Sequence, residues 1–561
     1  MQRKAHSHPA NPTRPWHPTH LLIVLALWLA SIGNAPLWAE LYRLLPASGG
    51  LRPLTLAAWG LALSGATLAF LALWVWPRWL KAAGFALLLV TACTSYFMFT
   101  YRVVIDPTML ANALHTDARE VRDLLSPAML LFLAAGVLLP GWWWWRQPVR
   151  PVRPTRLVLG QLLWAALGLL LAVALLWLTF QDLASAMRNH KPVRYMINPF
   201  NTVYALARNL PSPAAWTPQA LQPVGEDARL VAVPAAASEA PLIVLVVGET
   251  ARAANMGLAG YGRDTTPRLA ALQARGELVY FSDVRACGTN TQVSVPCMFS
   301  DLPRQAFDGR QPRENLLDVV QRAGLAVLWI DNQSGCKGVC DRVAQMDTRS
   351  LAIPGLCDGG ECVDEVLLRV LPEAIERLDS ERRALGTLVV LHPMGSHGPA
   401  YFRRTPANFK PFQPECTQTD LQACPPEALV NAYDNTLRYT DHVLAETVAW
   451  LQSQPRPAAL VYVSDHGESL GEKGLYLHGM PYSLAPDEQT HVPMLLWMNP
   501  AMRERSGIDP ACLQARAQQP ASHDHLFHTL LGLMGVATRA YAPEMDLTHA
   551  CRQPALNATS G

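Results

Sequence analysis

The chain has 561 residues, of which 16% are charged and 50% are hydrophobic, and its mean hydropathy is +0.11. This apolar content with a net charge of only +2 excludes a disordered chain, and 46 basic against 44 acidic residues leave no excess for wholesale nucleic-acid binding. Fourteen of the 17 tryptophans precede residue 241, whereas ten of the 11 cysteines follow it. The two parts of the chain are therefore suited to two different solvents.

Five long stretches of the first part contain no Asp, Glu, Lys or Arg. Each is near or above the roughly 20 residues with which a helix crosses about 30 Å of hydrocarbon. Buried helices of a soluble domain rarely repeat such runs five times. The stretches predict five membrane-spanning helices, over residues 21–39, 53–77, 82–101, 124–145 and 157–181.

The charges that flank these stretches predict their orientation. The N-terminus and two alternate loops carry nine positive charges and no negative charge: Arg3, Lys4, Arg14, Arg78, Lys81, Arg146, Arg150, Arg153 and Arg156. Positive loops stay in the cytoplasm, so five crossings deliver everything after Asp182 to the far side. The first span begins like a signal peptide. However, its apolar run is long and no clean cleavage site follows it, so we expect it to be retained.

We therefore expect a transmembrane domain over 1–182, a connector over 183–241 on the far side of the membrane and a soluble domain over 242–561. Proline and alanine dominate residues 211–241, which is typical of a semi-extended connector. Cys93, inside a predicted span, is expected to be a free thiol.

The soluble part contains ten cysteines, eight of them in close pairs: Cys287/Cys297, Cys336/Cys340, Cys357/Cys362 and Cys416/Cys424, with Cys512 and Cys551 remaining. An exported domain favours disulfides, whereas the C-x₃-C spacing also resembles a zinc site. The predicted location favours disulfides. The sequence leaves their connectivity open.

Short apolar runs alternate with helical stretches in this part. The runs 242–247, 326–330, 387–391 and 460–463 predict buried parallel strands. Residues 315–323 and 432–452 predict helices between them. The fold class is therefore α/β with a mostly parallel sheet.

Polar residues of catalytic type follow each predicted strand. Open α/β sheets place their ligand sites at the carboxyl ends of the strands, so we expect these side chains to converge. In chain order they are Glu249, Lys337, His392, His397, Asp465, His466 and Glu468, with His478 soon afterwards.

Two carboxylates and an imidazole suit a zinc ion. Glu249, Asp465 and His466 would supply three ligands and leave the fourth position open. Thr291 lies in a loop that Cys287 and Cys297 can close. A metal lowers the pKa of a bound hydroxyl and so makes it a nucleophile. The simpler alternative for a threonine in this context is a helix N-cap.

Four segments carry a resemblance to a known family: GETAR (248–252), CGTNTQVSVPCMFS (287–300), SDHGES (464–469) and LHGMPY (477–482). With them, essentially the whole chain resembles the lipid A phosphoethanolamine transferases, inner-membrane enzymes associated with polymyxin (colistin) resistance. The resemblance implies five spans and a periplasmic domain of the alkaline-phosphatase/sulfatase superfamily.

The resemblance also implies roles for residues. Thr291 would be the zinc-bound nucleophile that becomes modified by phosphoethanolamine, with Glu249, Asp465 and His466 as zinc ligands. The residues that would handle phosphate, a second metal or proton transfer are Lys337, His397, Glu468 and His478. Gln333 stands where some relatives have asparagine, so its contact with substrate is open. We interpret His523, His525 and His528, on a predicted late helix, as structural.

Residues 109–120, in the predicted periplasmic loop, resemble the stretch that binds the phosphoethanolamine lipid head, with Asn112 and Glu120 as the residues of interest. The alternative is an amphipathic helix lying on the membrane.

The function implied is transfer of phosphoethanolamine from phosphatidylethanolamine to lipid A, through a covalent threonine and with one catalytic zinc ion or two. We expect a monomer that contacts membrane lipids and no nucleic acid. One alternative is a phosphoglycerol or phosphoethanolamine transferase with another envelope glycan as acceptor. Another is a non-enzymatic, zinc-containing membrane scaffold. A sulfatase is disfavoured because no C-x-P-x-R element follows Cys287.

Overall fold

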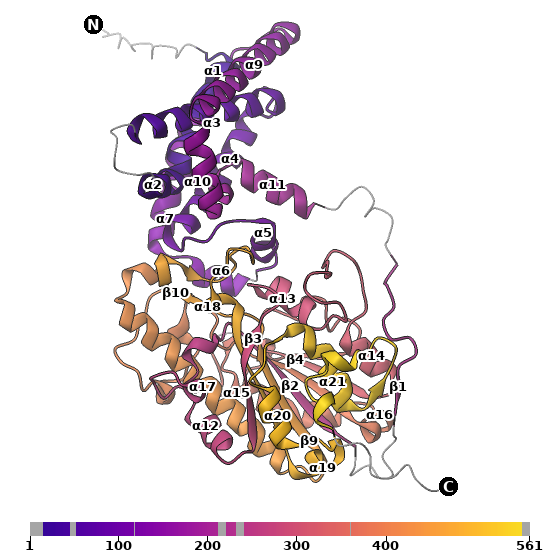
Figure 1. Ribbon diagram of the computed structural model, residues 1–561. Coiled ribbons are helices and arrows are strands. Elements are labelled where there is room, and N and C mark those ends of the chain that lie inside the picture. Colours follow the sequence, from indigo (N-terminus) through magenta and orange to yellow (C-terminus); the bar gives the residue numbers. More distant parts are fainter. Residues whose placement is uncertain are drawn as a thin grey trace, which may run out of the picture. The chain divides into compact units, whose positions relative to one another are not determined.

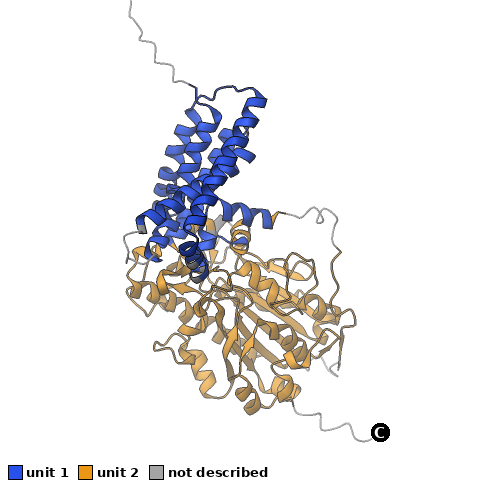
Figure 2. Ribbon diagram, turned by 45° about the horizontal axis from the view of Figure 1, so that its top comes forward, with its two compact units in different colours: residues 1–100, 104–107, 125–208 blue, residues 101–103, 108–124, 209–561 orange. Residues whose placement is uncertain are grey.

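The computed structural model describes residues 15–44, 52–116, 118–210, 220–231, 240–358 and 361–552. The chain forms two compact units (Figure 2). Unit 1 comprises residues 1–100, 104–107 and 125–208, and unit 2 comprises residues 101–103, 108–124 and 209–561.

Unit 1 is helical and contains five segments long and apolar enough to cross a membrane: Pro18–Leu44, Pro53–Trp74, Leu80–Thr100, Pro127–Arg146 and Pro154–Leu178. The five predicted spans are thereby confirmed, with ends that shift by a few residues. The helices are α1 (Pro18–Ala30), η1 (Ile32–Asn34), α2 (Ala35–Leu44), α3 (Arg52–Trp74), α4 (Leu80–Thr100), α7 (Pro127–Leu133), η2 (Ala134–Leu138), α8 (Leu139–Arg146), α9 (Pro154–Leu178), α10 (Phe180–Asn189), η3 (Lys191–Met196) and α11 (Phe200–Asn209).

The first span is broken between α1 and α2 by a buried asparagine. The Asn34 amide nitrogen donates to the carbonyls of Leu29 and Asn198, each at 2.7 Å, and its oxygen accepts from the Asn198 N–H at 2.9 Å. Backbone groups freed in hydrocarbon need such partners. The pair therefore satisfies the break and ties it to the segment before α11.

Helices α3 and α9 pack through glycines. A Cβ atom on Gly65 would lie 2.5 Å from the Gly168 carbonyl oxygen, and one on Gly168 would lie equally close to that of Gly65. Ala69, Ala72 and Ala165 continue this contact. Small residues let membrane helices approach closely and gain dispersion energy.

Unit 1 extends beyond the predicted domain boundary at residue 182. Helices α10, η3 and α11 belong to it as far as Arg208. Charged residues such as Asp182 and Arg188 interrupt the apolar sequence there, so these helices do not have the long uncharged stretches that predict the spans. The connector predicted over 183–241 therefore begins later in the structure, and its residues 211–219 and 232–239 lie outside the described part.

Unit 2 is built on an eight-stranded sheet with the order β13-β3-β12-β9-β2-β8-β4-β5, in which only β12 runs antiparallel to its neighbours. Its strands are β2 (Leu242–Gly248), β3 (Leu278–Arg285), β4 (Ala326–Asp331), β5 (Ala344–Asp347), β8 (Thr387–His392), β9 (Ala458–Ser464), β12 (His491–Met498) and β13 (Ala521–Ser522). The predicted α/β class is confirmed, and the four predicted strands are β2, β4, β8 and β9. Short pairs outside this sheet are β1 (Arg229–Leu230) with β14 (Val536–Ala537), β6 (Cys357–Asp358) with β7 (Glu361–Cys362), and β10 (Ser469–Leu470) with β11 (Tyr476–Leu477).

Helices cover both faces of the sheet (Figure 1). Residues of α14 and α21 join Ile243, Leu245 and Val247 of β2 in one large buried cluster, and α12, α15 and α17 lie on the other side. Helices therefore shield the strands, which are buried on both faces.

The helices of unit 2, in chain order, are α5 (Pro107–Leu114), α6 (Ala118–Leu124), α12 (Pro267–Ala274), α13 (Thr291–Met298), α14 (Leu316–Arg322), α15 (Glu365–Glu376), α16 (Ser380–Leu385), α17 (Pro426–Gln452), α18 (Asp487–Thr490), α19 (Pro500–Ser506), α20 (Pro510–Arg516) and α21 (Leu526–Met534).

Five disulfides brace unit 2: Cys287–Cys297, Cys336–Cys340, Cys357–Cys362, Cys416–Cys424 and Cys512–Cys551. Cys93 is a free thiol. The bonded sulfurs of Cys336 and Cys340 are not available as thiolate ligands, which removes the zinc interpretation of that C-x₃-C spacing.

Candidate active site

The central strands of the sheet end in polar side chains at one edge. Strands β9, β2, β8 and β4 are consecutive neighbours, and Gly248 of β2 lies in register with Ser464 of β9. Glu249 and Asp465 therefore leave adjacent strands at the same level. The Asp465 N–H donates to the Gly248 carbonyl at 2.8 Å, which fixes this junction.

The Thr291 hydroxyl lies within this group of side chains. Its oxygen is 3.4 and 3.3 Å from Oε1 and Oε2 of Glu249, and 3.4 Å from Nε2 of His466. His466 Nε2 is in turn 3.4 Å from Oδ2 of Asp465 and 3.6 Å from Oε1 of Glu249. All four side chains are buried.

These spacings fit one metal ion. Ligands about 2.0–2.2 Å from a tetrahedral zinc ion lie about 3.3–3.6 Å from one another, which is the range of the distances above. Oδ2 of Asp465 is buried without a hydrogen-bond partner, whereas Oδ1 accepts from the Thr250 and His466 N–H groups. His466 Nδ1 lies 2.9 Å from the Gly467 carbonyl, which makes Nδ1 the donor and leaves the Nε2 lone pair for a metal.

The pKa shifts of these groups also fit a site that binds a cation. Burial raises the pKa of Glu249 to about 7 and that of Asp465 to about 7, and it lowers the pKa of His466 to about 4. A divalent cation among the side chains favours ionised carboxylates and a neutral imidazole. The donor set therefore matches Zn²⁺ in chemistry as well as in spacing.

Thr291 is the first residue of α13, and it does not cap that helix. The cap is Asn290, whose side chain accepts from the Val293 N–H at 3.1 Å. The Ser294 hydroxyl donates to the Asp465 carbonyl, and the Cys287–Cys297 disulfide closes the loop. The Thr291 hydroxyl is thus left to face the carboxylates.

A second cluster of titratable groups adjoins the first. Nδ1 of His478 lies 2.8 Å from Oε2 of Glu468, and the His478 ring lies 4.3 Å from that of His466 and 5.8 Å from that of His397. Burial lowers the pKa of His478 to about 4 and holds that of His397 well below its ordinary value. Both imidazoles are therefore neutral near neutral pH and able to exchange protons.

Gln333 and Lys337 follow β4. The Gln333 amide donates to Oε2 of Glu249 at 3.1 Å, so the structure places it on a candidate metal ligand. Lys337 has a positive φ of 52°, and its ammonium donates to Ser334 Oγ at 2.8 Å. Its charge is one of the causes, after burial, that lower the pKa of His397.

Three further residues contact the site. His392 is among the polar residues that the sequence predicts to converge there, whereas Tyr401 and Thr250 are not. The Tyr401 hydroxyl donates to Oε1 of Glu468. His392 pairs with Asp331 through Nδ1 at 3.0 Å, and its Nε2 lies 4.0 Å from Oε2 of Glu249. Thr250 holds a φ of 60° and donates to Oε1 of Glu249 at 2.6 Å. His392 and Thr250 had a signal, because each stands at a strand end beside predicted site residues.

The predicted periplasmic loop also reaches this site. Helix α5 belongs to unit 2, and the Met109 sulfur lies 2.6 Å from the position that a Cβ of Gly479 would take, one residue after His478. Asn112 is half-buried on α5. The side chain of Glu120, on α6, lies outside the described part of the chain.

The late histidines hold loops through their ring nitrogens. Nδ1 of His523 accepts from the Cys287 N–H at 3.0 Å, and its Nε2 lies 2.9 Å from the Ser464 carbonyl. His525 accepts from the Ser522 N–H, and His528 accepts from the Ala542 N–H. These bonds are consistent with the structural roles expected of them.

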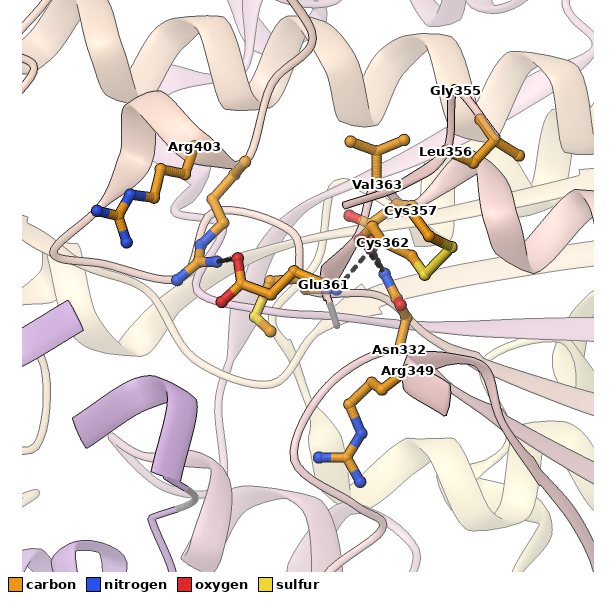
Figure 3. Close-up of a pocket in the computed structure, with 12 residues that line it drawn as sticks. Asn332, Arg349, Gly355, Leu356, Cys357, Glu361, Cys362, Val363 and Arg403 are labelled. Atoms are coloured by element: carbon orange, nitrogen blue, oxygen red, sulfur yellow. Dashed lines mark hydrogen bonds and ion pairs between the residues drawn. A yellow bond between two sulfur atoms is a disulfide. The ribbon is translucent and has the colours of Figure 1, made fainter. Parts of the chain in front are cut away.

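A cavity of about 660 Å³ opens beside Asn332 and is lined by the β6–β7 hairpin and by Arg349, Arg403 and Arg404 (Figure 3). Its charges are already compensated. Arg404 pairs with Asp123 at 2.6 Å and with Glu361 at 3.5 Å, and Arg349 pairs with Asp347. The cavity therefore offers little net charge to an anion.

Comparison with known proteins identifies the family. Residues 241–536 match the sulfatase family, and residues 63–213 match the family described as phosphoethanolamine transferase EptA/EptB. Phosphoethanolamine transferase EptA of Salmonella typhimurium is 41% identical over 497 residues, which cover 86% of this chain and 87% of that protein. The chain belongs to the EptA-type phosphoethanolamine transferases.

Other members agree in length and structure. Phosphatidylethanolamine transferase Mcr-1 of Escherichia coli is 36% identical over 92% of this chain and 95% of its own. The integral membrane protein lipooligosaccharide phosphoethanolamine transferase A of Neisseria meningitidis has a TM-score of 0.90 at 36% identity, covering 95% of this chain and 99% of that one. This phosphoethanolamine transferase is therefore an inner-membrane enzyme whose catalytic unit lies in the periplasm.

Proposed function

We propose that the enzyme transfers phosphoethanolamine from phosphatidylethanolamine to a phosphate of lipid A through a covalent intermediate on Thr291. The observation that carries the proposal is the Thr291 hydroxyl, buried and 3.3–3.4 Å from Glu249 and His466. A hydroxyl in a structural role would cap α13, but Asn290 does so instead. The names of the relatives support the same donor and the same transferred group.

In the first step, the Thr291 oxygen attacks the phosphorus of phosphatidylethanolamine, and the bond from phosphorus to the diacylglycerol oxygen breaks. The Thr291 hydroxyl loses its proton in this attack, and diacylglycerol leaves as an alcohol that carries one proton. The neutral imidazoles of His397 and His478 are the candidates to accept the first proton and then to donate it to the leaving oxygen. In the second step, a lipid A phosphate oxygen attacks the phosphorus, and the Thr291 oxygen leaves and regains a proton that the attacking phosphate group gives up.

The residues that would hold Zn²⁺ are Glu249, Asp465, His466 and Thr291. When bound, zinc supplies positive charge that lowers the pKa of the threonine hydroxyl and neutralises charge on the phosphoryl oxygens. Gln333 and Thr250 orient the Glu249 carboxylate through their hydrogen bonds. Thr291 is the first residue of α13, so the N-terminus of this helix would favour the negative charge of a phosphoryl group on Thr291.

Lipid A modified in this way gains an ammonium group. Its net negative charge falls, and with it the attraction for cationic peptides. We therefore expect cells that produce the enzyme to resist polymyxin and colistin, and their lipid A to gain the mass of phosphoethanolamine. Modification of another envelope glycan, with lipid A unchanged, would redirect the acceptor.

Mass spectrometry of the purified enzyme given phosphatidylethanolamine tests the covalent step. We expect the mass of phosphoethanolamine on the peptide that contains Thr291, and its absence in Thr291→Ala. Thr289→Ser is the matched control, because it keeps a hydroxyl in the same loop and should keep the adduct on Thr291. An adduct on another residue would overturn the assignment. Full zinc occupancy with no adduct would instead favour a non-enzymatic scaffold.

A further inference from the structure

Unit 1 contains a cavity of about 670 Å³ with an almost entirely apolar lining. Its walls are α2, α3, the end of α9, α10 and the segment from η3 to α11. This volume is in the range of about 300–1,000 Å³ that ligand sites occupy. We call it the lipid groove.

The lining of the groove is mostly apolar, and the polar side-chain atoms of three of its residues are hydrogen-bonded within unit 1. The indole N–H of Trp38 donates to the Ala30 carbonyl at 2.8 Å, and that of Trp59 donates to the Thr179 hydroxyl at 2.9 Å. The Asn201 amide donates to the carbonyls of Ile105 and Tyr195. The occupant of this lining must therefore be apolar over most of its length.

The topology places the groove between the periplasmic side and the middle of the membrane. Helix α2 closes the first span, and Leu176 lies near the periplasmic end of α9. Trp59 to Ala66 lie in the middle of α3, which enters the membrane from the periplasm. At 1.5 Å per residue they lie about 10 to 21 Å along the helix from Arg52, so the groove reaches the middle of a hydrocarbon layer of roughly 30 Å.

One charged side chain, Arg194 of η3, lines the groove. It is exposed, and its Nε donates to the Met187 carbonyl at 2.8 Å. Among the described side chains, no carboxylate lies within ion-pair distance of its guanidinium. Tyr195 and Tyr204 also line the groove, and aromatic residues of this kind are enriched at the level of lipid head groups. The groove therefore combines one cationic side chain, Arg194, with an apolar lining. This combination suits a lipid that has a phosphate and an acyl chain.

We propose that the lipid groove binds a diacyl glycerophospholipid of the periplasmic leaflet, with an acyl chain along α3 and its phosphate on Arg194. The inference rests on the proposed function, in which such a lipid, phosphatidylethanolamine, is the donor. The charge of Arg194 selects it over the product, because diacylglycerol has no phosphate. The Asn34–Asn198 hydrogen bonds join the break before α2 to the segment before α11, and both helices line the groove.

The test uses the full-length enzyme in a detergent that lacks phosphate, with phosphatidylethanolamine that has a photoreactive diazirine in one acyl chain. We expect crosslinks on peptides that contain Trp59–Ala66 and Tyr195–Tyr204. Excess unlabelled phosphatidylethanolamine should remove them, and diacylglycerol should not. Labelling spread evenly over all lipid-facing helices would overturn the proposal, as would competition by diacylglycerol equal to that of the phospholipid, or competition by lipid A alone.

Two variants and one control sharpen the test. Ala66→Trp fills the groove and should lower labelling and raise KM for the lipid donor, each by about tenfold, the effect of roughly 1.4 kcal/mol. Arg194→Gln should weaken phospholipid competition to a similar degree, because it loses a charge-assisted contact. The control is Ala57→Trp, an exposed alanine outside the groove on the same helix, and it should change neither. An equal effect of Ala57→Trp would contradict the assignment.

The two proposals fail separately. If groove labelling is absent while the adduct on Thr291 still forms, the groove assignment is wrong and the transfer mechanism stands. If the groove is labelled as expected but wild-type enzyme forms no adduct, the transfer mechanism is wrong. Thr291→Ala should keep groove labelling at the wild-type level.

Discussion

At the scale of single residues, the site depends on side chains that constrain one another in a buried setting. Glu249 accepts hydrogen bonds from Thr250 and Gln333 while it faces Thr291 and His466. Both oxygens of Glu249 are therefore oriented before any metal binds. Pre-orientation of this kind raises the affinity and the precision of a metal site.

The contribution of Glu249 to the stability of the metal-free enzyme should be lost as pH rises from about 5 to about 8. Burial raises the pKa of Glu249 from 4.5 to about 7 in the folded state. Its protonated form therefore favours folding, with a contribution that is full below the unfolded pKa and is lost as pH rises through the folded one. Zinc should restore the stability at the higher pH, because a cation favours the ionised carboxylate. Thermal unfolding after treatment with a chelator, with and without added zinc, measures both effects.

Glu249→Gln is the reference for that measurement. It removes the titrating group but keeps the size of the side chain, so the stability of the metal-free wild type should fall relative to that of the variant as pH rises, and the variant should respond less to zinc. The comparison also separates Glu249 from His466, whose lowered pKa acts in the opposite direction. A difference in stability between wild type and Glu249→Gln that does not change with pH would contradict the prediction.

Some of the site was predictable and some was not. Glu249, Asp465 and His466 follow directly after uniformly apolar strands, and parallel strands bring their carboxyl ends together whatever the loops do. Tyr401 lies nine residues after β8, and its contact with Glu468 depends on the path of an irregular loop. No periodicity in the sequence encodes such a path.

At the scale of elements, α6 is held on unit 2 by a buried ion pair. Asp123 contacts Arg404 at 2.6 Å and Arg403 at 2.5 Å, and Nε of Arg404 donates to the His397 carbonyl at 3.1 Å. The side chains of Asp123 and Arg404 are only 3% and 4% exposed. A loop between two spans is thereby joined to the residue that is a candidate for proton transfer.

Asp123→Asn should destabilise unit 2 and slow the transfer reaction. Removing one partner leaves a buried guanidinium poorly compensated, at a cost of about 3–5 kcal/mol. The His397 backbone then loses part of its support, so we expect kcat to fall more than KM rises. Thermal unfolding and steady-state kinetics measure the two effects. Arg122→Ala, an exposed neighbour on α6, is the control, and an equal loss there would show that α6 matters without the ion pair.

The membrane helices give a second test at this scale. Gly168→Val places a side chain against the Gly65 carbonyl and must push α3 and α9 apart, at a cost of about 1–3 kcal/mol. Gly160→Val, on the same helix, meets nothing within 4 Å and should be neutral. Unfolding temperatures in detergent compare the two variants. Equal temperatures would show that the close approach does not stabilise unit 1.

At the scale of the whole molecule, the division between a membrane unit and a periplasmic unit was evident in the sequence, but its boundary was not. Uncharged runs marked the spans because hydrocarbon excludes charge. Residues 183–208 and 108–124 are amphipathic or mixed, and composition does not show to which unit they belong. The ion pair between Asp123 and Arg404 joins positions 281 residues apart, a pairing that only the folded chain shows.

The joining of the two units should matter for lipid substrates and much less for the chemistry. A fragment of residues 220–561 retains the sheet, the disulfides and the residues around Thr291, so it should form the Thr291 adduct from a water-soluble phosphoethanolamine ester within about tenfold of the full-length rate. With phosphatidylethanolamine in vesicles its rate should fall by about 10²-fold or more, because donor and enzyme no longer share one membrane. The same fragment also lacks α6, so Asp123→Asn in the full chain serves as the control. If that variant alone reproduced the loss on vesicles, the missing ion pair would explain it, and the membrane anchor would not.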